Sequence, residues 1–117
     1  MARAQGLNRA YLIGRAVATP ELRTGPNGTH VAALMLAVPS ARMVDGAWQE
    51  GQDEHRIVAH GDDAAWLAAT AGEGDAVAVE CEVRPDRWTD RNGCTRTATS
   101  LVLVRVMWLS KAARVTT

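Results

Sequence analysis

The alternation of apolar and polar side chains between Asp75 and Arg84 constrains the fold of this chain more than any other feature. The inward positions carry Val77, Val79, Cys81 and Val83, and the outward positions include Glu80, Glu82 and Arg84. A period of two is produced by a β-strand with one face against a core. The same period recurs along most of the chain, so the sequence predicts a β-rich domain.

Apolar runs bounded by turn residues predict five strands. They span Asn8–Ala18, His30–Val38, Glu54–His60, Asp75–Arg84 and Thr95–Trp108. The dipeptides Asn27-Gly28, Asp45-Gly46 and Asn92-Gly93 are turn signals, since both residue types tolerate positive φ. Ser40–Asp53 is interpreted as a polar connection centred on the Asp45-Gly46 turn.

The segment Asp62–Ala71 predicts one short helix, because it is rich in alanine and followed by Gly72. Asp62 is the expected N-cap and Trp66 the expected apolar anchor on the sheet. The order of three strands, a helix and two strands predicts an all-β fold, a five-stranded Greek-key OB barrel with the helix between strands 3 and 4. Residues 1–110 would form this domain and residues 111–117 a short C-terminal extension.

Composition excludes several classes of protein. No apolar run approaches the roughly 20 residues that span a bilayer, and the start lacks a secretory signal, which predicts a cytoplasmic protein without membrane contact. Cys81 and Cys94 do not form a C-x-x-C pair, so we expect reduced thiols, no metal site and no cofactor. We find no catalytic motif, and the Asp62–Asp63 pair is better explained by a helix start, so we expect no enzyme activity.

Five segments follow one another in a recognisable order between Leu7 and Leu109. They are Leu7–Arg15, Thr19–Arg23, Pro26–Thr29, the pair Trp48–Glu50 and His55–Val58, and Arg87–Gly93. Together they resemble the bacterial single-stranded DNA-binding protein family. The resemblance implies an OB fold, a homo-oligomer (a tetramer rather than a dimer), and sequence-tolerant binding of single-stranded DNA in replication, repair or recombination. It also implies a nucleoid-associated location, replication or repair proteins as partners, and no catalysis.

Binding of single strands without sequence preference combines cations that follow the phosphates with aromatic faces that stack on bases. The candidate stacking residues are Trp88, Trp48 and His60, and the candidate phosphate contacts are Arg3, Arg9, Arg56, Arg84, Arg87, Arg91 and Arg96. The resemblance places His55 near an oligomer interface. We expect Trp66 and Trp108 to be structural.

Several positions depart from the family's pattern. Glu54 and His60 stand where the family has aromatic residues, Asp62 and Glu73 stand where it often has lysine, and Asp86 lies in a hairpin that is usually more basic. The formal net charge is zero, with 13 basic and 13 acidic residues. The last residues, Ser110 to Thr117, do not resemble the family's tail with an acidic tip, so we expect no such tail to recruit partners.

These departures keep other hypotheses open. One is a protein–protein adaptor or a mixed-oligomer subunit of a primosome or repair complex with weak DNA binding, and another is RNA binding. Trp88 is also compatible with a lid or a subunit contact, Trp48 with loop packing, and His60 with a solvated surface position. Oligomerisation is expected because His30–Val38 is apolar on both faces, whereas a lone barrel covers one.

Overall fold

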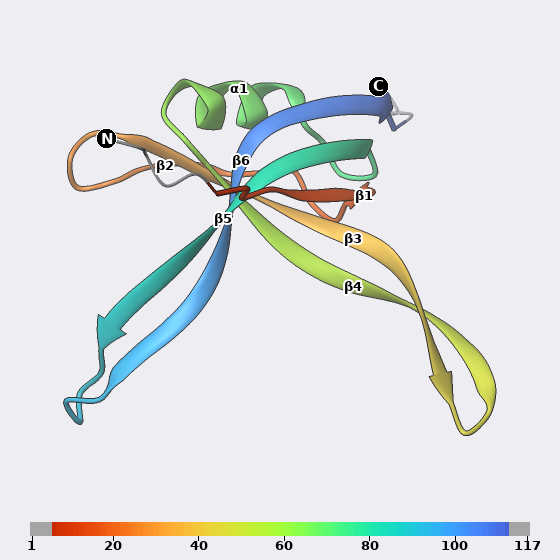
Figure 1. Cartoon of the computed structure of the whole chain (residues 1–117). Helices are drawn as coiled ribbons and strands as arrows, with labels where there is room; N and C mark the ends of the chain where they lie inside the picture. Colours follow the sequence, from red (N-terminus) through yellow and green to blue (C-terminus); the bar gives the residue numbers. More distant parts are fainter. Residues whose placement is uncertain (1–5, 113–117) are drawn as a thin grey trace.

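The computed structural model describes residues 6–112. Its elements are β1 (Ala10–Ala16), β2 (Leu22–Thr24), β3 (His30–Val44), β4 (Ala47–His60), α1 (Asp62–Thr70), β5 (Ala76–Thr89) and β6 (Thr95–Ser110) (Figure 1). The sheet order is β1-β5-β6-β4-β3-β2, and β1 also pairs with β3, which closes the five long strands into a ring. The predicted barrel, with a helix between its third and fourth long strands, is therefore confirmed. The short β2 was not predicted.

The barrel interior is filled by alternate residues of the long strands. Leu34, Leu36, Ile57 and Val77 are fully buried there, at 0% exposure. Burial of each side chain of this size contributes about 1.5–3 kcal/mol. The inward face predicted for the fourth long strand is confirmed at Val77, Val79 and Cys81, which all belong to this core.

Two long hairpins project from the barrel as separate arms (Figure 1). The β3–β4 arm pairs without interruption from Val31↔His60 to Val44↔Ala47, so the interpretation of Ser40–Asp53 as a polar connection was wrong. Asp45 and Gly46, with φ of 50° and 80°, form a tight two-residue turn at its tip. The arm is exposed on both faces along most of this stretch, so no apolar alternation reveals it as strand.

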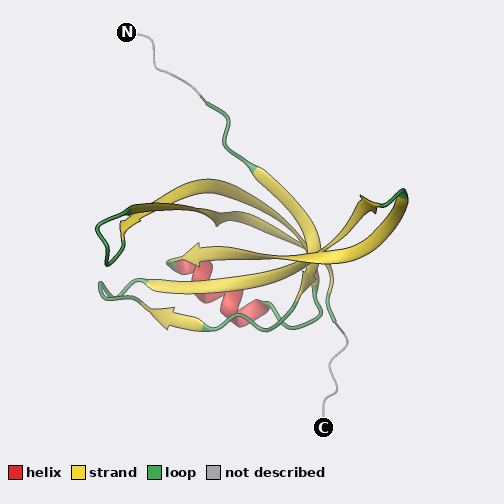
Figure 2. Cartoon of the chain, turned by 90° about the horizontal axis from the view of Figure 1, so that it is seen from below, coloured by secondary structure: helices red, strands yellow, loops and turns green. Residues whose placement is uncertain are grey.

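The helix lies at the end of the barrel away from the arms, against β3 and β4 (Figure 1), and Figure 2 shows it beside the strands after a 90° turn. Its N-cap is Gly61, with φ 65° and no side-chain cap, so the capping role expected of Asp62 was wrong. The buried anchor is Leu67, at 0% exposure, whereas Trp66 is 45% exposed and lies against Trp108, with ring centroids 6.0 Å apart. No helix within residues 6–112 is long and apolar enough to cross a bilayer.

Hydrogen bonds to Asp75 connect the residues after β6 to the loop before β5, and the Asp75 side chain is fully buried. The carboxylate accepts hydrogen bonds from Gly72 N, Ala112 N and Lys111 Nζ, the last at 2.8 Å. The Lys111 ammonium also lies 4.2 Å from the ring centroid of Trp108. Burial alone would raise the pKa of Asp75, but these donors lower it to about 2. Lys111 and Ala112, which we assigned to an extension, thus contact the barrel.

Candidate nucleic-acid interface

The outer side of β4 carries the centre of the candidate interface. Arg56, Val58 and His60 alternate there with Ile57 and Ala59, which are fully buried on the core side. The same strand register fixes the neighbours of this row. Met35, Ala33 and Val31 of β3 stand opposite Arg56, Val58 and His60, respectively.

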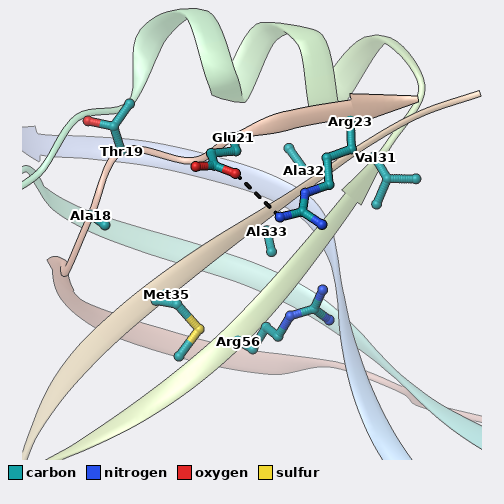
Figure 3. Close-up of a pocket in the computed structure, with 9 residues that line it drawn as sticks. All are labelled: Ala18, Thr19, Glu21, Arg23, Val31, Ala32, Ala33, Met35 and Arg56. Atoms are coloured by element: carbon teal, nitrogen blue, oxygen red, sulfur yellow. Dashed lines mark hydrogen bonds and ion pairs between the residues drawn. The ribbon is translucent and has the colours of Figure 1, made fainter. Parts of the chain in front are cut away.

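A first hollow of about 390 Å³ opens on this side between β2, β3 and β4. Figure 3 shows the guanidinium groups of Arg23 and Arg56 over the same strands. Arg23 pairs with Glu21 at 3.4 Å. The lining residues are Ala18, Thr19, Glu21, Arg23, Val31, Ala32, Ala33, Met35 and Arg56.

Arg23 is a lining residue that was not among the predicted binding residues. Arg23 lies within one of the five family-like segments, Thr19–Arg23, and that was the signal available. Its strand is only three residues long and exposed throughout, so no apolar alternation indicates where the side chain points. The pairing of Arg23 with Val31 brings it to the hollow.

A second hollow of about 280 Å³ lies between β4, β5 and β6. Its lining residues are Arg56, Val58, His60, Arg84, Asp86, Ser100 and Val102. Arg56 lines both hollows, so they adjoin, and we call them together the double hollow. Of the predicted binding residues, the structure thus brings Arg56, His60 and Arg84 to one place.

The cations of the double hollow differ in their existing partners. Arg84 pairs with Glu82 at 3.2 Å, on an exposed part of β5. Within residues 6–112, no ion pair engages Arg56. Exposed ion pairs contribute little to stability, so the Arg84 guanidinium can leave Glu82 for an anion at little cost. Arg56 can bind an anion without giving up an ion pair within residues 6–112.

The tryptophans of interest stand on the two arms. Trp88 lies on β5 and is 50% exposed, and Trp48 lies near the tip of the β3–β4 arm and is 67% exposed. The arms point in different directions from the barrel (Figure 1), so the structure does not bring the two indoles together. Both retain a large free surface within the single chain. Trp48 faces Met43 across the hairpin rather than packing into a loop.

Arg96 stands opposite Trp88 in the β5–β6 hairpin, but it has a structural partner there. Its Nε donates to Asp90 at 2.9 Å, and Asp90 also accepts from the backbone N–H groups of Asn92 and Cys94. The Arg96 guanidinium and these backbone donors lower the pKa of Asp90. Arg96 therefore stabilises the turn that supports Trp88. Arg87, adjacent to Trp88, points to the opposite side of the strand.

The other predicted residues lie elsewhere. Arg9 forms an ion pair with Glu80 at 3.4 Å, and neither residue lines the double hollow. His55 is half-buried on the same side of β4 as Ile57. Arg91 is exposed in the β5–β6 turn, and Arg3 lies outside the described residues.

Carboxylates accompany the arginines. Glu54 shares the outer side of β4 with Arg56, Asp62 begins the helix two residues after His60, and Asp86 lines the second hollow itself. Residues 6–112 contain no group of three or more His, Cys, Asp or Glu side chains placed to hold a metal ion. The arginines of the double hollow can bind an anionic polymer, and the neighbouring carboxylates would weaken that binding.

Comparison with known proteins agrees with this geometry. The fold is similar to that of a solved chain described as the Plasmodium falciparum SSB complex with ssDNA, with a TM-score of 0.75 and 22% identity, covering 93% of this chain and 100% of that chain. The family model described as single-strand binding protein family matches residues 7–109. The chain therefore belongs to the single-strand binding protein family.

Proposed function

We propose that this protein binds single-stranded DNA in a sequence-tolerant manner across the double hollow. The observation that carries the proposal is the position of Arg56, which lines both hollows between two arms with exposed indoles. Arg56, Arg84 and Arg23 would neutralise successive phosphates, and Trp88 would stack on an unpaired base. Such a protein would act where replication, repair or recombination exposes single strands.

We expect the affinity to be modest. Each stacked base contributes about 1–3 kcal/mol, and Glu54 and His60 replace two aromatic platforms. Glu54 also places a negative charge on the same side of β4 as Arg56. The affinity should therefore depend strongly on the remaining arginines, and should fall steeply as salt rises.

Titration of tryptophan fluorescence with oligo-dT at low salt tests the proposal. Binding should quench the emission, and Trp88→Leu should remove much of the quenching and weaken binding by about tenfold. Trp66→Leu is the control, because Trp66 lies against Trp108 at the helix and outside the double hollow. Emission that stays unchanged with micromolar DNA would contradict the proposal and favour the protein–protein adaptor. RNA of equal length, added as a competitor, tests the preference for DNA.

We also propose that the protein forms a homo-oligomer, a tetramer rather than a dimer. The outer face of His30–Val38, from which we inferred oligomerisation, is half-buried and lines the first hollow instead. A better candidate is the row Ile13–Ala78–Met107 across β1, β5 and β6, in which Ile13 is 61% and Met107 56% exposed. Tyr11 and Leu109, at 69% and 51%, extend this apolar surface.

Sedimentation velocity at micromolar concentration measures the oligomeric state directly. We expect the wild-type protein to sediment as an oligomer. The double substitution Ile13→Lys and Met107→Lys should shift it toward the monomer, because two buried charges would oppose association. A stable wild-type monomer would overturn the proposal of an oligomer, but it would not contradict the proposal of DNA binding.

A further inference from the structure

The second hollow contains one acidic side chain among cationic and neutral ones. Its polar lining comprises Arg56, His60, Arg84, Asp86 and Ser100. A carboxylate at this place opposes phosphate binding, but it can accept a hydrogen bond from a base. Such a role for Asp86 rests on the DNA binding proposed above.

The side chain of Asp86 is hydrogen-bonded to the neighbouring strand β6. The hydroxyl of Ser100 on β6 donates a hydrogen bond to Asp86 Oδ2. Within residues 6–112, no hydrogen bond engages Oδ1. The hollow therefore offers Asp86 Oδ1 as an acceptor, with the donor groups of Arg84 and Arg56 along the same lining.

An ionised carboxylate accepts hydrogen bonds and donates none. We propose that Asp86 makes this surface prefer cytosine over thymine. Cytosine presents the N4 amino donor beside the acceptors N3 and O2, which match a carboxylate next to an arginine. Thymine presents a single N3–H donor between two carbonyl oxygens, and these oxygens would be repelled by the carboxylate.

The second hollow contains one small aromatic ring, the imidazole of His60, and no tryptophan, tyrosine or phenylalanine. Sequence tolerance arises where binding relies on stacking, because every base has a π-face. His60 stands where the family has a larger aromatic residue, and Asp86 and Ser100 can reach base edges but offer no face for stacking. A base that enters this hollow can therefore be contacted through its edge as well as its face, and edges differ between bases.

Fluorescence anisotropy with labelled dC and dT strands of equal length, at equal salt and pH 8, tests the inference. The wild-type protein should bind dC about three- to tenfold more tightly than dT, as one additional hydrogen bond implies. Asp86→Ala should bring the ratio close to one. It should also raise the affinity for dT, because a negative charge leaves the path of the phosphates.

Glu73→Gln is the matched control, since it removes one negative charge from an exposed position outside the hollow. It should leave the ratio of the two affinities unchanged. A wild-type protein that binds dT as tightly as dC, or a ratio that survives Asp86→Ala, would overturn the inference while leaving DNA binding intact. Failure of both strands to bind at low salt would instead refute the proposed function.

Discussion

Gly14 lies against the carbonyl group of Ala37, so closely that a β-carbon on Gly14 would stand 2.2 Å from the carbonyl oxygen. The next two residues of β1, Arg15 and Ala16, pair with β3 and close the barrel. A residue without a side chain therefore stands where β1 approaches β3. A larger residue at this position would push apart the strands whose pairing closes the ring, since only Arg15 and Ala16 of β1 pair with β3, whereas Ala10 to Arg15 pair with β5.

We predict that Gly14→Ala destabilises the protein by about 1–3 kcal/mol, the range found when atoms are forced into a packed site. The displaced atom would be backbone, which cannot rotate away. Urea unfolding at fixed protein concentration measures the loss. Gly51→Ala is the control, since its β-carbon would meet Ser40 Oγ at an ordinary 3.9 Å. If the two variants unfold at the same urea concentration, β1 and β3 can move apart at this position without a loss of stability, and the prediction is wrong.

The buried carboxylate of Asp75 should make the free energy of unfolding depend on pH in the acid range. Its pKa is about 2 in the folded protein, below the ordinary value of 3.8, so its contribution is fully present above pH 4 and is lost as pH falls through about 2. This shift corresponds to roughly 2 kcal/mol. Asp75→Asn should therefore cost about that much at pH 7, and its unfolding free energy should approach that of the wild type near pH 2.

Glu73→Gln provides the comparison for this acid dependence, because Glu73 lies two residues away but is exposed. Unfolding of the three proteins should be followed by circular dichroism across pH 2 to 7. The difference in unfolding free energy between wild type and Glu73→Gln should stay small from pH 2 to 7. If the difference between wild type and Asp75→Asn does not change with pH, the hydrogen bonds to Lys111 and Ala112 do not depend on the negative charge of Asp75.

The sequence predicts the barrel well where one strand face is buried. Val77, Val79 and Cys81 are buried and alternate with half-buried neighbours, so a period of two is visible. The arms carry no such signal: from Ala41 to Gln52 every residue of the β3–β4 hairpin is exposed. Their strand structure comes from pairing across the turn at Asp45 and Gly46, and pairing leaves no apolar period in the sequence.

The site is predictable in part for a similar reason. Residue type identifies arginines and tryptophans as candidates, but the strand register decides which of them meet. Register places Arg23 beside Val31 and brings it to the double hollow, whereas Arg9 faces Glu80 on another part of the barrel. The bond between Arg96 and Asp90 depends on the shape of a five-residue turn. Neither relation follows from the residue types alone.

The two cysteines should differ sharply in reactivity. Cys81 is fully buried, and burial, aided by the charge of Glu80, raises its pKa to about 11, whereas Cys94 is exposed in the β5–β6 turn. Because the thiolate is the reactive form, a maleimide at pH 7.5 should label one thiol per native chain and two per unfolded chain. Mass spectrometry of Cys94→Ser identifies the site, since this variant should resist labelling until it unfolds. Rapid native labelling of Cys81 would contradict the packing of β5.

A comparison of substitutions at Arg56 and Arg9 should distinguish an arginine that contacts a DNA phosphate from one that is paired elsewhere on the protein. Arg56→Gln should weaken oligo-dT binding and reduce the slope of log K against log salt by about 0.7, the value for one phosphate on a single strand. Arg9→Gln removes the same charge, but its guanidinium already pairs with Glu80, away from the double hollow. It should therefore leave the slope nearly unchanged. An equal loss of slope in both variants would show that DNA follows the β1 side of the barrel as well, and that the double hollow is only part of its path.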